Sequence, residues 1–413
     1  MTIDARRMAE RCEALARHTE QPDGLTRVFL SPEQRAVNDL VRGWMGEAGM
    51  DTRLDAIGNV VGRYEGTRPG LPCLMLGSHL DTVRDAGRYD GMLGVVAGIE
   101  CVADLHARGV RLPFAIEVVG FADEEGVRFA ATLLGSQAVA GHFDPALLDR
   151  TDAHGIPMRD ALVASGLDPA RIREAARRPD EILAYVELHI EQGPVLEAER
   201  LPVGVVIAIS GGNRFNVEIA GHAGHAGTVP MGLRRDALAA AAECVVAVER
   251  IARGQPGVVG TVGRIEALPG AINVIPGRVR FTLDARAPGD ELRQQAVAAM
   301  KDEFAAIAGR RDVTLTVSPV WEARTAACAP ALQRQLAAAI HAEGVRVHHL
   351  PSGAGHDGMA LVAIAPIGML FVRCGGGISH NPAEAVSVDD IAVATRVLAR
   401  FISEFAPPRQ PLA

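Results

Sequence analysis

Short apolar runs alternate with longer helix-patterned stretches through most of this chain. The run at 71–78 predicts a buried strand, 93–109 predicts a helix, and 114–122 predicts a second strand. Two further runs, at 183–190 and 367–374, predict buried strands of the same kind. Apolar strands separated by helices are typical of a parallel sheet that is covered on both faces. The pattern therefore predicts an α/β fold with a mostly parallel sheet and helices on both of its faces.

One helix start is marked by its capping residues. Ser31 supplies an N-cap, Pro32 suits the first helical position, and Gln34 completes a capping box. The apolar residues that follow recur at helical spacing, which gives the helix one buried face. These residues are Val37, Leu40, Val41, Trp44 and Met45.

The pattern changes between residues 212 and 327, where apolar and polar residues alternate at 214–220 and again at 279–286. In order, the segments are strand 214–220, helix 234–252, extended chain 258–268, strand 279–286, helix 291–309 and strand 313–320. The order βαββαβ is that of a ferredoxin-like α+β sandwich. Because the SHNPAE segment with its candidate ligand comes afterwards, this domain is predicted to be inserted. We therefore expect an α/β domain formed by residues 1–211 and 328–413, and an inserted domain at 212–327.

Length and composition fit a two-domain soluble protein. The 413 residues exceed one ordinary core, and 48% are hydrophobic and 22% charged. No apolar run approaches the roughly 18–20 residues of a membrane span, and the N-terminus lacks the apolar region of a signal peptide. Six scattered cysteines without a C-x-x-C pair suggest a reduced, cytoplasmic protein. The net charge of −8 argues against a nucleic-acid partner.

Metal-binding side chains stand where predicted strands give way to loops. They are His79, Asp90, Glu125, His189 and His380, with Asp81 and Glu124 beside them. Open α/β sheets bind ligands beyond the carboxyl ends of their strands, so we expect these residues to converge. Histidines and carboxylates without thiolates suit Zn²⁺, Mn²⁺ or Co²⁺. Because the set exceeds the needs of one ion and a carboxylate can bridge two, it predicts two divalent ions that share a water.

Two carboxylates of this set have predicted roles beyond holding an ion. Asp81 follows His79 by two residues, so both side chains point to the same side of an extended chain and Asp81 can orient the imidazole. Glu125 would bind metal, while its neighbour Glu124 would take a proton from the water between the ions.

Each motif also has an ordinary explanation when it is taken alone. H-x-D is common in polar loops, Asp90 before glycine fits a turn, the acids at 123–125 fit a solvated turn, and His189 fits a packed core histidine. The joint placement at strand ends favours metal binding. His225 and His356 lie in glycine-rich loops, where function and packing are equally open.

Eight motifs that follow one another along the chain carry a family resemblance. They are GSHLDTV, YDGMLGV, FADEEGVRF, LHIEQGPVLE, GHAGTVPM, NVIPGRVRFTLDAR, SGAGHD and SHNPAEAV. From about residue 25 to 400 the chain resembles the hydantoinase/carbamoylase amidases of the M20 peptidase clan. These include allantoate amidohydrolase, N-carbamoyl-L-amino acid hydrolase and β-ureidopropionase. HIEQGP and HAGTVPM separate this family from the peptidases of the clan.

The resemblance implies a site with two divalent ions. His79 and His189 would bind one ion, Glu125 and His380 the other, and Asp90 would bridge them. The same resemblance implies that Asp81 orients a ligand and that Glu124 is the general base.

The resemblance further implies a set of residues that contact substrate. They are Gln192, His225, Asn273, Arg286 and His356. Arg286 would hold a substrate carboxylate, for which its planar fork is suited, and His225 would stabilise the oxyanion. The inserted domain would act as a lid and form a homodimer, with some of these residues reaching the partner's active site. Val229 and Gly358 depart from the family pattern, but neither is an implied ligand.

The implied reaction is hydrolysis of a terminal ureido (carbamoyl) group on a small carboxylate, with release of ammonia and CO₂. Overall likeness favours allantoate as the substrate, with N-carbamoyl-L-amino acids or N-carbamoyl-β-alanine as alternatives. An aminoacylase or dipeptidase on the same scaffold is a further alternative, against which HIEQGP argues. A non-enzymatic binding protein would be expected to have lost its ligands, and all of them are present.

Overall fold

The computed structural model describes residues 3–408 and separates into two compact units. The first unit consists of the chain up to Ile207, Cys328–Leu350 and the chain from Ala354 onward. The second unit consists of Ala208–Ala327 together with Pro351–Gly353. Each unit has a hydrophobic core of its own.

A nine-stranded mixed sheet has the order β1-β2-β4-β3-β5-β16-β6-β14, and β15 pairs with β6. Apart from β14, whose residues belong to the second unit, this sheet forms the framework of the first unit. Its strands are β1 (Asp51–Leu54), β2 (Val60–Tyr64), β3 (Cys73–His79), β4 (Ala115–Phe121), β5 (Ile182–Ile190), β6 (Val203–Ile209), β14 (Ala326–Ala327), β15 (His349–Ser352) and β16 (Ile367–Val372).

The centre of this sheet is parallel and its margins are antiparallel. β4, β3, β5 and β16 are parallel neighbours, whereas β2 and β6 flank them in the opposite direction. β1 and β2 form a hairpin whose turn is closed by Asp55, which accepts hydrogen bonds from the N–H groups of Ile57, Gly58 and Asn59. A tight turn of this kind can only join antiparallel strands, so the expected parallel order holds for the centre of the sheet alone.

Helices and short 3-10 turns connect these strands. The helices are α1 (Ala5–Ala16), α2 (Pro32–Glu47), α3 (Met92–Ala107), α4 (Leu134–Val139), α5 (Met158–Ala164), α6 (Val195–Ala198), α9 (Pro330–Ala342), α10 (Gly358–Leu361) and α11 (Val388–Glu404). The 3-10 turns are η1 (Pro145–Asp149), η2 (Pro169–Ala175), η3 (Pro179–Glu181) and η5 (Gly375–Gly377). None of the helices within residues 3–408 combines the length and the apolar character that crossing a bilayer requires.

Strand alternation sends the residues of β5 to two different faces of the sheet. Ala184, Val186 and Leu188 join the large core that also contains α1, α3 and α11. The odd-numbered Tyr185 and His189 therefore point to the opposite face. α10 contacts β5 and β16, so the sheet also carries a helix beside the strand that bears His189.

The start of α2 follows the sequence prediction in part. α2 begins at Pro32, and the Ser31 hydroxyl accepts a hydrogen bond from the N–H of Gln34 at 3.1 Å. The side chain of Gln34 turns to Asn38 instead and donates to its Oδ1 at 2.8 Å. The N-cap prediction is confirmed, whereas the second half of the predicted capping box is replaced by a contact one turn further along the helix.

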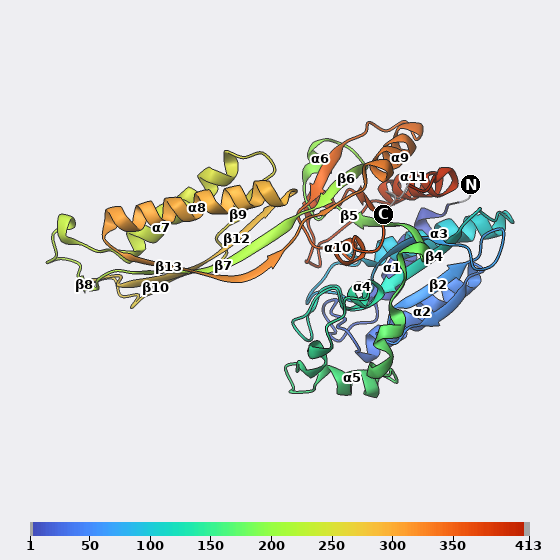
Figure 1. Ribbon diagram of the computed structural model, residues 1–413, viewed down its shortest axis with the longest axis horizontal. Coiled ribbons are helices and arrows are strands. Elements are labelled where there is room, and N and C mark those ends of the chain that lie inside the picture. The colour runs from blue at the N-terminus through green and yellow to red at the C-terminus, as the bar shows by residue number, and fades with distance from the viewer. Residues whose placement is uncertain (1–2, 409–413) are drawn as a thin grey trace. The chain divides into compact units, whose positions relative to one another are not determined.

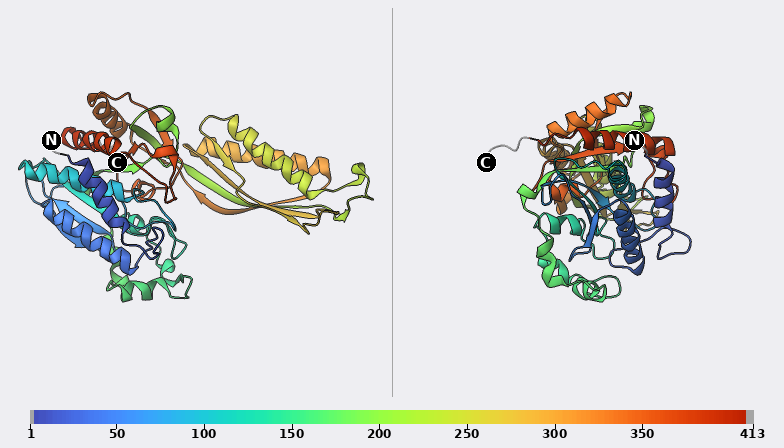
Figure 2. Two further views of the ribbon diagram at one scale, coloured as in Figure 1. Left: turned by 180° about the vertical axis from the view of Figure 1, so that it is seen from behind. Right: turned by 90° about the vertical axis from the view of Figure 1, so that its right-hand side faces the viewer.

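The second unit has an antiparallel sheet with the order β10-β12-β7-β13, and β9 also pairs with β12. Its strands are β7 (Gly211–Ala220), β9 (Val259–Thr261), β10 (Ile265–Leu268), β12 (Arg278–Ala287) and β13 (Thr314–Ala323), with a separate pair β8 (Gly224–His225) and β11 (Val274–Ile275). Its helices are α7 (Ala237–Arg253) and α8 (Asp290–Arg311), with a 3-10 turn, η4 (Met231–Leu233). Figure 1 shows α7 and α8 along one face of this sheet, and Figure 2 shows the same arrangement from behind.

The two faces of this second sheet have opposite chemistry. Odd-numbered residues such as Phe215, Val217 and Phe281 are buried in the core beneath α7 and α8. Even-numbered residues such as Glu218 and Arg280 lie on the other face and pair with one another, with Arg280 Nε 2.8 Å from Glu218 Oε2. The alternation read from the sequence therefore has its expected structural consequence, with one apolar and one polar face.

Candidate metal centre and substrate-contact residues

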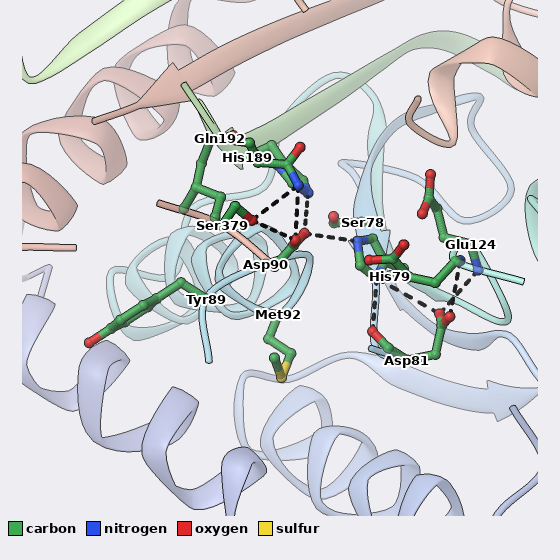
Figure 3. A network of polar contacts seen from close by, with 12 residues as sticks. Ser78, His79, Asp81, Tyr89, Asp90, Met92, Glu124, His189, Gln192 and Ser379 are labelled. Atoms are coloured by element: carbon green, nitrogen blue, oxygen red, sulfur yellow. Dashed lines mark hydrogen bonds and ion pairs between the residues drawn. The ribbon is translucent and has the colours of Figure 1, made fainter. Parts of the chain in front are cut away.

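The predicted metal ligands come from segments at one edge of the central sheet. His79 ends β3, His189 lies at the end of β5, Glu125 follows β4, Asp90 precedes α3, and His380 follows β16. Because β4, β3, β5 and β16 are parallel neighbours, their carboxyl ends meet at the same edge. Figure 3 shows the side chains of His79, Asp90 and His189 turned toward one another.

Asp90 lies at the centre of this arrangement. Its Oδ1 is 3.4 Å from Nε2 of His79 and 3.2 Å from Nε2 of His189. Its Oδ2 is 3.3 Å from Nε2 of His380, which in turn is 3.3 Å from Oε1 of Glu125. Each oxygen of one carboxylate therefore faces a different pair of side chains. We call His79, Asp90 and His189 the first trio, and Asp90, Glu125 and His380 the second trio.

Backbone carbonyls fix the two imidazoles of the first trio. Nδ1 of His79 is 3.0 Å from the carbonyl oxygen of Asp81, and Nδ1 of His189 is 2.9 Å from the carbonyl oxygen of Ile190. A carbonyl oxygen can only accept, so each Nδ1 carries a proton in this arrangement. Each Nε2 is directed at Asp90 and, in the neutral imidazole, carries the lone pair that a metal-binding histidine requires.

This donor set fits divalent metal ions. Within the described residues, Nε2 of His189 and Oδ1 of Asp90 are buried and have no hydrogen-bond partner. Buried polar atoms of this kind are costly unless another group satisfies them. The ligand atoms of the first trio lie within 4.8 Å of one another, and so do those of the second trio. Nitrogen and oxygen donors in two groups with a shared carboxylate suit ions such as Zn²⁺, Mn²⁺ or Co²⁺.

Asp81 orients His79 by a route that differs from the expected one. The hydrogen bond to the imidazole comes from the backbone carbonyl of Asp81, while its carboxylate Oδ1 lies 3.8 Å from Nδ1 of His79. The carboxylate instead accepts the N–H groups of Glu124 and Glu125, each at 3.1 Å. The turn at Asp123, which has a φ of 54°, presents these two N–H groups together. Asp81 thus holds the backbone of both acids.

The charges in the centre favour cations beside Asp90. Although burial opposes ionisation, the nearby imidazoles of His189, His380 and His79 hold the pKa of Asp90 well below its usual range. Asp90 and then Glu125 raise the pKa of His380 to about 10. Positive charge is therefore stabilised at the positions between Asp90 and the imidazoles around it.

Glu124 lies next to these trios and is 8% exposed. Burial, and then the carboxylates of Glu125 and Asp357, raise the pKa of Glu124 well above its usual range, against the opposing effect of His79. Its backbone is fixed by the hydrogen bond to Asp81. A buried carboxyl group with this tendency to take up a proton has the properties of a general base or acid.

Gln192 and two residues that the motif reading did not single out surround Asp90. Nε2 of Gln192 donates to Oδ2 of Asp90 at 2.9 Å and lies 3.2 Å from Oγ of Ser379. The same Oγ is 3.0 Å from Oδ2 of Asp90 and 3.0 Å from Oε2 of Glu384. Ser379 and Glu384 lie within the SHNPAE motif, which was the available signal. Gln192, predicted as a substrate contact, is bound here to Asp90 (Figure 3).

Arg27 is a further residue that the sequence reading missed. It is fully buried, and its Nε donates to the carbonyl of Leu80 at 2.9 Å while Nη1 donates to that of Leu15 at 2.8 Å. Its backbone N–H donates to Oγ1 of Thr82 at 2.9 Å. These bonds hold the segment that directly follows His79. The available signal was an arginine within the apolar run of RVFL.

His356 lies beside the first trio. Its ring centroid is 4.5 Å from that of His189, with the rings edge to face at 62°. It is 1% exposed, and burial and then His189 lower its pKa well below the usual range. A neutral imidazole is therefore favoured at this position.

Arg286 lies in the second unit and is held by fixed partners. Its Nε and Nη2 donate to the two carboxylate oxygens of Asp284 at 2.9 and 3.0 Å, and Nη1 donates to the carbonyl of Gly353 at 2.7 Å. Asp284 also accepts from Nε of Arg214 at 2.9 Å. In the described structure these contacts use three of the five N–H bonds of the guanidinium group, which leaves two for another acceptor.

His225 and Asn273 lie at the other end of the second unit. His225 is in β8, which pairs with β11, and the carbonyl of Asn273 accepts the N–H of Ala226 at 2.9 Å. Both side chains are exposed. Arg278 begins β12 beside this pair of strands, and Arg286 stands near the opposite end of β12, which is 10 residues long. At about 3.4 Å per residue, the two ends of this strand are roughly 30 Å apart.

Comparisons with known proteins agree in sequence and in fold. The chain matches the family model "Peptidase family M20/M25/M40" over residues 75–404. It is 44% identical to an N-carbamoyl-L-amino acid amidohydrolase of Geobacillus stearothermophilus, over 98% of this chain and 99% of the relative. It is 40% identical to a probable allantoate deiminase of Oryza sativa subsp. japonica, over 96% and 87%. A solved hydantoinase/carbamoylase family amidase of Burkholderia multivorans has a TM-score of 0.91 at 35% identity, with 98% and 99% covered.

Proposed function

Because the chain belongs to peptidase family M20/M25/M40, as an amidohydrolase of the carbamoylase and allantoate amidohydrolase type, we propose that it hydrolyses the terminal ureido group of a small carboxylate. The observation that carries this proposal is the sharing of Asp90 between two trios of metal-binding side chains. A carboxylate with one oxygen toward each trio is the arrangement that a pair of ions requires.

The two trios would each hold one divalent ion. His79 and His189 would hold the first, Glu125 and His380 the second, with Asp90 between them. When bound, two such ions lower the pKa of a shared water and polarise the carbonyl oxygen of the substrate. Zn²⁺, Mn²⁺ and Co²⁺ all fit these nitrogen and oxygen donors.

Glu124 is the proposed general base. It would accept a proton from the attacking water and later deliver it to the nitrogen that leaves as ammonia. The remaining carbamate then breaks down to CO₂ and the amine of the acid. Its burial and the neighbouring carboxylates support this role, because they favour the protonated form that must exist between the two transfers.

Arg286 is proposed to bind the substrate carboxylate. Asp284 and the carbonyl of Gly353 hold the guanidinium group in one orientation and leave two N–H bonds for an anion. A group that is already oriented loses little entropy when it binds a planar carboxylate. His225 would stabilise the oxyanion, and Gln192, Asn273 and His356 are the other proposed substrate contacts.

N-carbamoyl-L-amino acids are the first candidate substrates. The specific observation is the 44% identity to an N-carbamoyl-L-amino acid amidohydrolase over nearly all of both chains. Allantoate, which the sequence alone favoured, is the second candidate and is supported by the relative named allantoate deiminase at 40% identity. Both substrates present a carboxylate and a ureido group, so the same residues would serve either.

The second unit is proposed to be the inserted, ferredoxin-like lid and dimerisation domain. The observation is the separation of about 30 Å along β12 between Arg286 and the pair His225 and Asn273. One small substrate cannot touch both ends of this strand, however the second unit is placed. If all three residues contact substrate, the two ends must serve the sites of two different chains, which favours a homodimer.

The first experiment is ammonia release from protein that has been stripped by chelator and refilled with Mn²⁺, Zn²⁺ or Co²⁺. The panel contains several N-carbamoyl-L-amino acids, allantoate, N-carbamoyl-β-alanine and an N-acetyl amino acid. Metal-dependent turnover of the first group supports the proposal, and turnover of allantoate alone replaces it with the second candidate. Activity confined to the N-acetyl amino acid would instead identify an aminoacylase. Tight binding of a ureido acid without ammonia release would indicate a binding protein.

Glu124→Gln tests the proposed base separately. We expect the variant to retain both ions, because Glu124 belongs to neither trio, and to lose kcat by at least about 10²-fold, as expected on loss of a general base. Elemental analysis and the ammonia assay measure the two effects. Glu199→Gln, an exposed glutamate that pairs with Arg346, is the matched control and should behave as wild type. Full activity of Glu124→Gln would reject this assignment.

A further inference from the structure

Glu384 ties together the two segments that carry Asp90 and His380. It lies four residues after His380, in the segment that precedes α11, and it is 3% exposed. Its Oε1 accepts the backbone N–H of Tyr89 at 2.8 Å and that of Asp90 at 3.1 Å. Its Oε2 is 3.0 Å from Oγ of Ser379. One buried carboxylate thus holds the backbone of the shared ligand and the residue before His380.

The surroundings of Glu384 are shaped to admit it. A Cβ atom at Gly87 would lie 2.1 Å from Cδ of Glu384, a distance that no packing tolerates. Residue 87 therefore has to be glycine for the carboxylate to reach the N–H groups of Tyr89 and Asp90. Gly87 is in the same segment as Asp90, so this segment is built around the side chain that it receives.

We propose that Glu384 is a positioning residue that is required to hold the second of the two ions, the one bound by Asp90, Glu125 and His380. This inference rests on the two-ion centre proposed above. It adds that the three residues of the second trio do not hold their arrangement alone. Glu384, which is outside the trio, joins the segment of Asp90 to the segment of His380.

We expect Glu384 to affect the second ion more than the first because the ligands of the two trios are held in place differently. The imidazoles of His79 and His189 come from strands β3 and β5, are at most 2% exposed, and are held by backbone carbonyls. His380 comes from a connecting segment, has a side chain that is 49% exposed, and has a φ of 53°. Loss of the tie through Glu384 therefore releases a ligand of the second trio, whereas the first trio keeps two ligands that strands hold in place.

The chemistry of the contact predicts which substitution is tolerated. Ser379 has one hydroxyl proton but lies 3.0 Å from both Asp90 and Glu384, so it can donate to only one of them. A glutamine at position 384 would keep the carbonyl oxygen for Tyr89 and Asp90. Its amide would donate to the Ser379 hydroxyl, which would then donate to Asp90. Glu384→Gln should therefore preserve the tie, and Glu384→Ala should remove it.

The experiment counts metal ions in the full-length chain after passage over a weak chelating resin, with Zn²⁺ or Mn²⁺ as the added metal. Wild type and Glu384→Gln are expected to retain two equivalents. Glu384→Ala is expected to retain one, with the Kd of the second raised about 10- to 100-fold, as is typical when a group that orients a ligand is lost. Its kcat should recover in excess metal while KM stays unchanged.

Two further variants separate positioning from general stability. Gly87→Ala should reproduce the loss of the second ion without changing Glu384 itself. Glu100→Ala is the matched control. Glu100 is 1% exposed and, like Glu384, joins two segments that are far apart in the sequence, since it accepts the N–H of Asp4, 96 residues earlier. Glu100 belongs to neither trio. The control substitution should lower Tm and leave two ions bound.

Retention of both ions by Glu384→Ala at unchanged Kd would overturn the inference, and so would an equal loss of both ions. If wild type binds fewer than two ions, the two-ion centre itself is wrong and this inference falls with it. The metal count of wild type thus distinguishes a failure of the proposed function from a failure of the role of Glu384.

Discussion

The two compact units present their functional side chains in opposite ways. In the first unit, residues from four separate segments converge on Asp90, and most of them are buried. In the second unit, the candidate residues lie at the two ends of one strand, and His225 and Asn273 are exposed. The difference teaches that the first unit brings its candidate residues together within one chain, whereas the length of β12 keeps the candidate residues of the second unit apart.

The physical basis of this difference is the sheet in each unit. Parallel neighbours align their carboxyl ends, so side chains that follow different strands meet at one edge. In the antiparallel sheet, consecutive strands begin at opposite ends. His225 and Asn273 lie beside the start of β12 and Arg286 lies near its end, so the length of this strand separates them. We therefore predict that substitutions in the first unit affect metal binding and proton transfer, and that substitutions in the second unit affect contacts with the substrate and its oxyanion.

The largest expected effect is that of Asp90→Ala. Since both trios contain Asp90, the variant should lose both ions and at least about 10³ in kcat, equivalent to several kcal/mol of transition-state stabilisation. Elemental analysis and ammonia release measure these losses. Asp104→Asn is the control, because Asp104 lies in α3, which follows Asp90, and pairs with Arg108; this variant should keep both ions. If Asp90→Ala still bound two ions, Asp90 would not be the ligand on which both trios depend, and the contrast drawn between the two units would be wrong.

A mixing experiment tests whether the two ends of β12 serve different chains. Glu124→Gln is mixed by subunit exchange with His225→Ala and, separately, with Arg286→Ala. If only one end acts across the dimer, one mixture should recover about a quarter of wild-type activity, because half of the dimers then contain one complete site of two.

The other mixture should stay inactive, and so should the control mixture of Glu124→Gln with Asp90→Ala, since both of these changes lie in the first unit. Recovery in both mixtures, or in neither, would contradict the proposed division of β12 between two chains. Size measurements of the exchanged protein establish that dimers are present in each sample.

Arg286→Lys is expected to have the smallest effect and to act on binding. Lysine lacks the planar fork, so KM for ureido carboxylates should rise about 10- to 100-fold, the effect of losing a charged hydrogen bond, while bound metal stays unchanged. Steady-state kinetics measure the change. Arg280→Lys lies on the same strand and polar face but pairs with Glu218, and it should leave KM as in wild type. An unchanged KM in Arg286→Lys would remove the carboxylate role from this residue.

Much of this architecture could be predicted because the signals are local. The cap at Ser31 and the odd-even alternation of Phe215 and Val217 depend on neighbours in the chain, and both are found in the structure. The five predicted ligands also occupy the two trios, and all of them except Asp90 lie at or just beyond the end of a strand that was recognisable as an apolar run. Patterns of this kind can be read from the sequence because they depend on the local backbone geometry of helices and strands and not on contacts between distant residues.

Apart from the side chain of Gln34, the contacts that the sequence did not predict correctly or at all join distant segments. The carboxylate of Asp81 was expected on His79 and is found on the backbone of residues 124 and 125. Glu384 and Arg27 bind segments far away in the chain, the former across 294 residues to Asp90. No spacing rule relates residues so far apart, and only the completed fold decides which donor a buried carboxylate or guanidinium group meets.

The sequence by itself determined the candidate metal ligands, the strands that carry them and the family to which the chain belongs, because residue type, motifs and short-range periodicity suffice for each. Only the tertiary structure decided which oxygen of Asp90 faces each trio, that Glu384 joins two ligand segments, and that Arg286 and His225 lie near opposite ends of β12. These are relations between segments, and a segment acquires its neighbours only when hydrophobic burial and sheet pairing bring distant parts of the chain together.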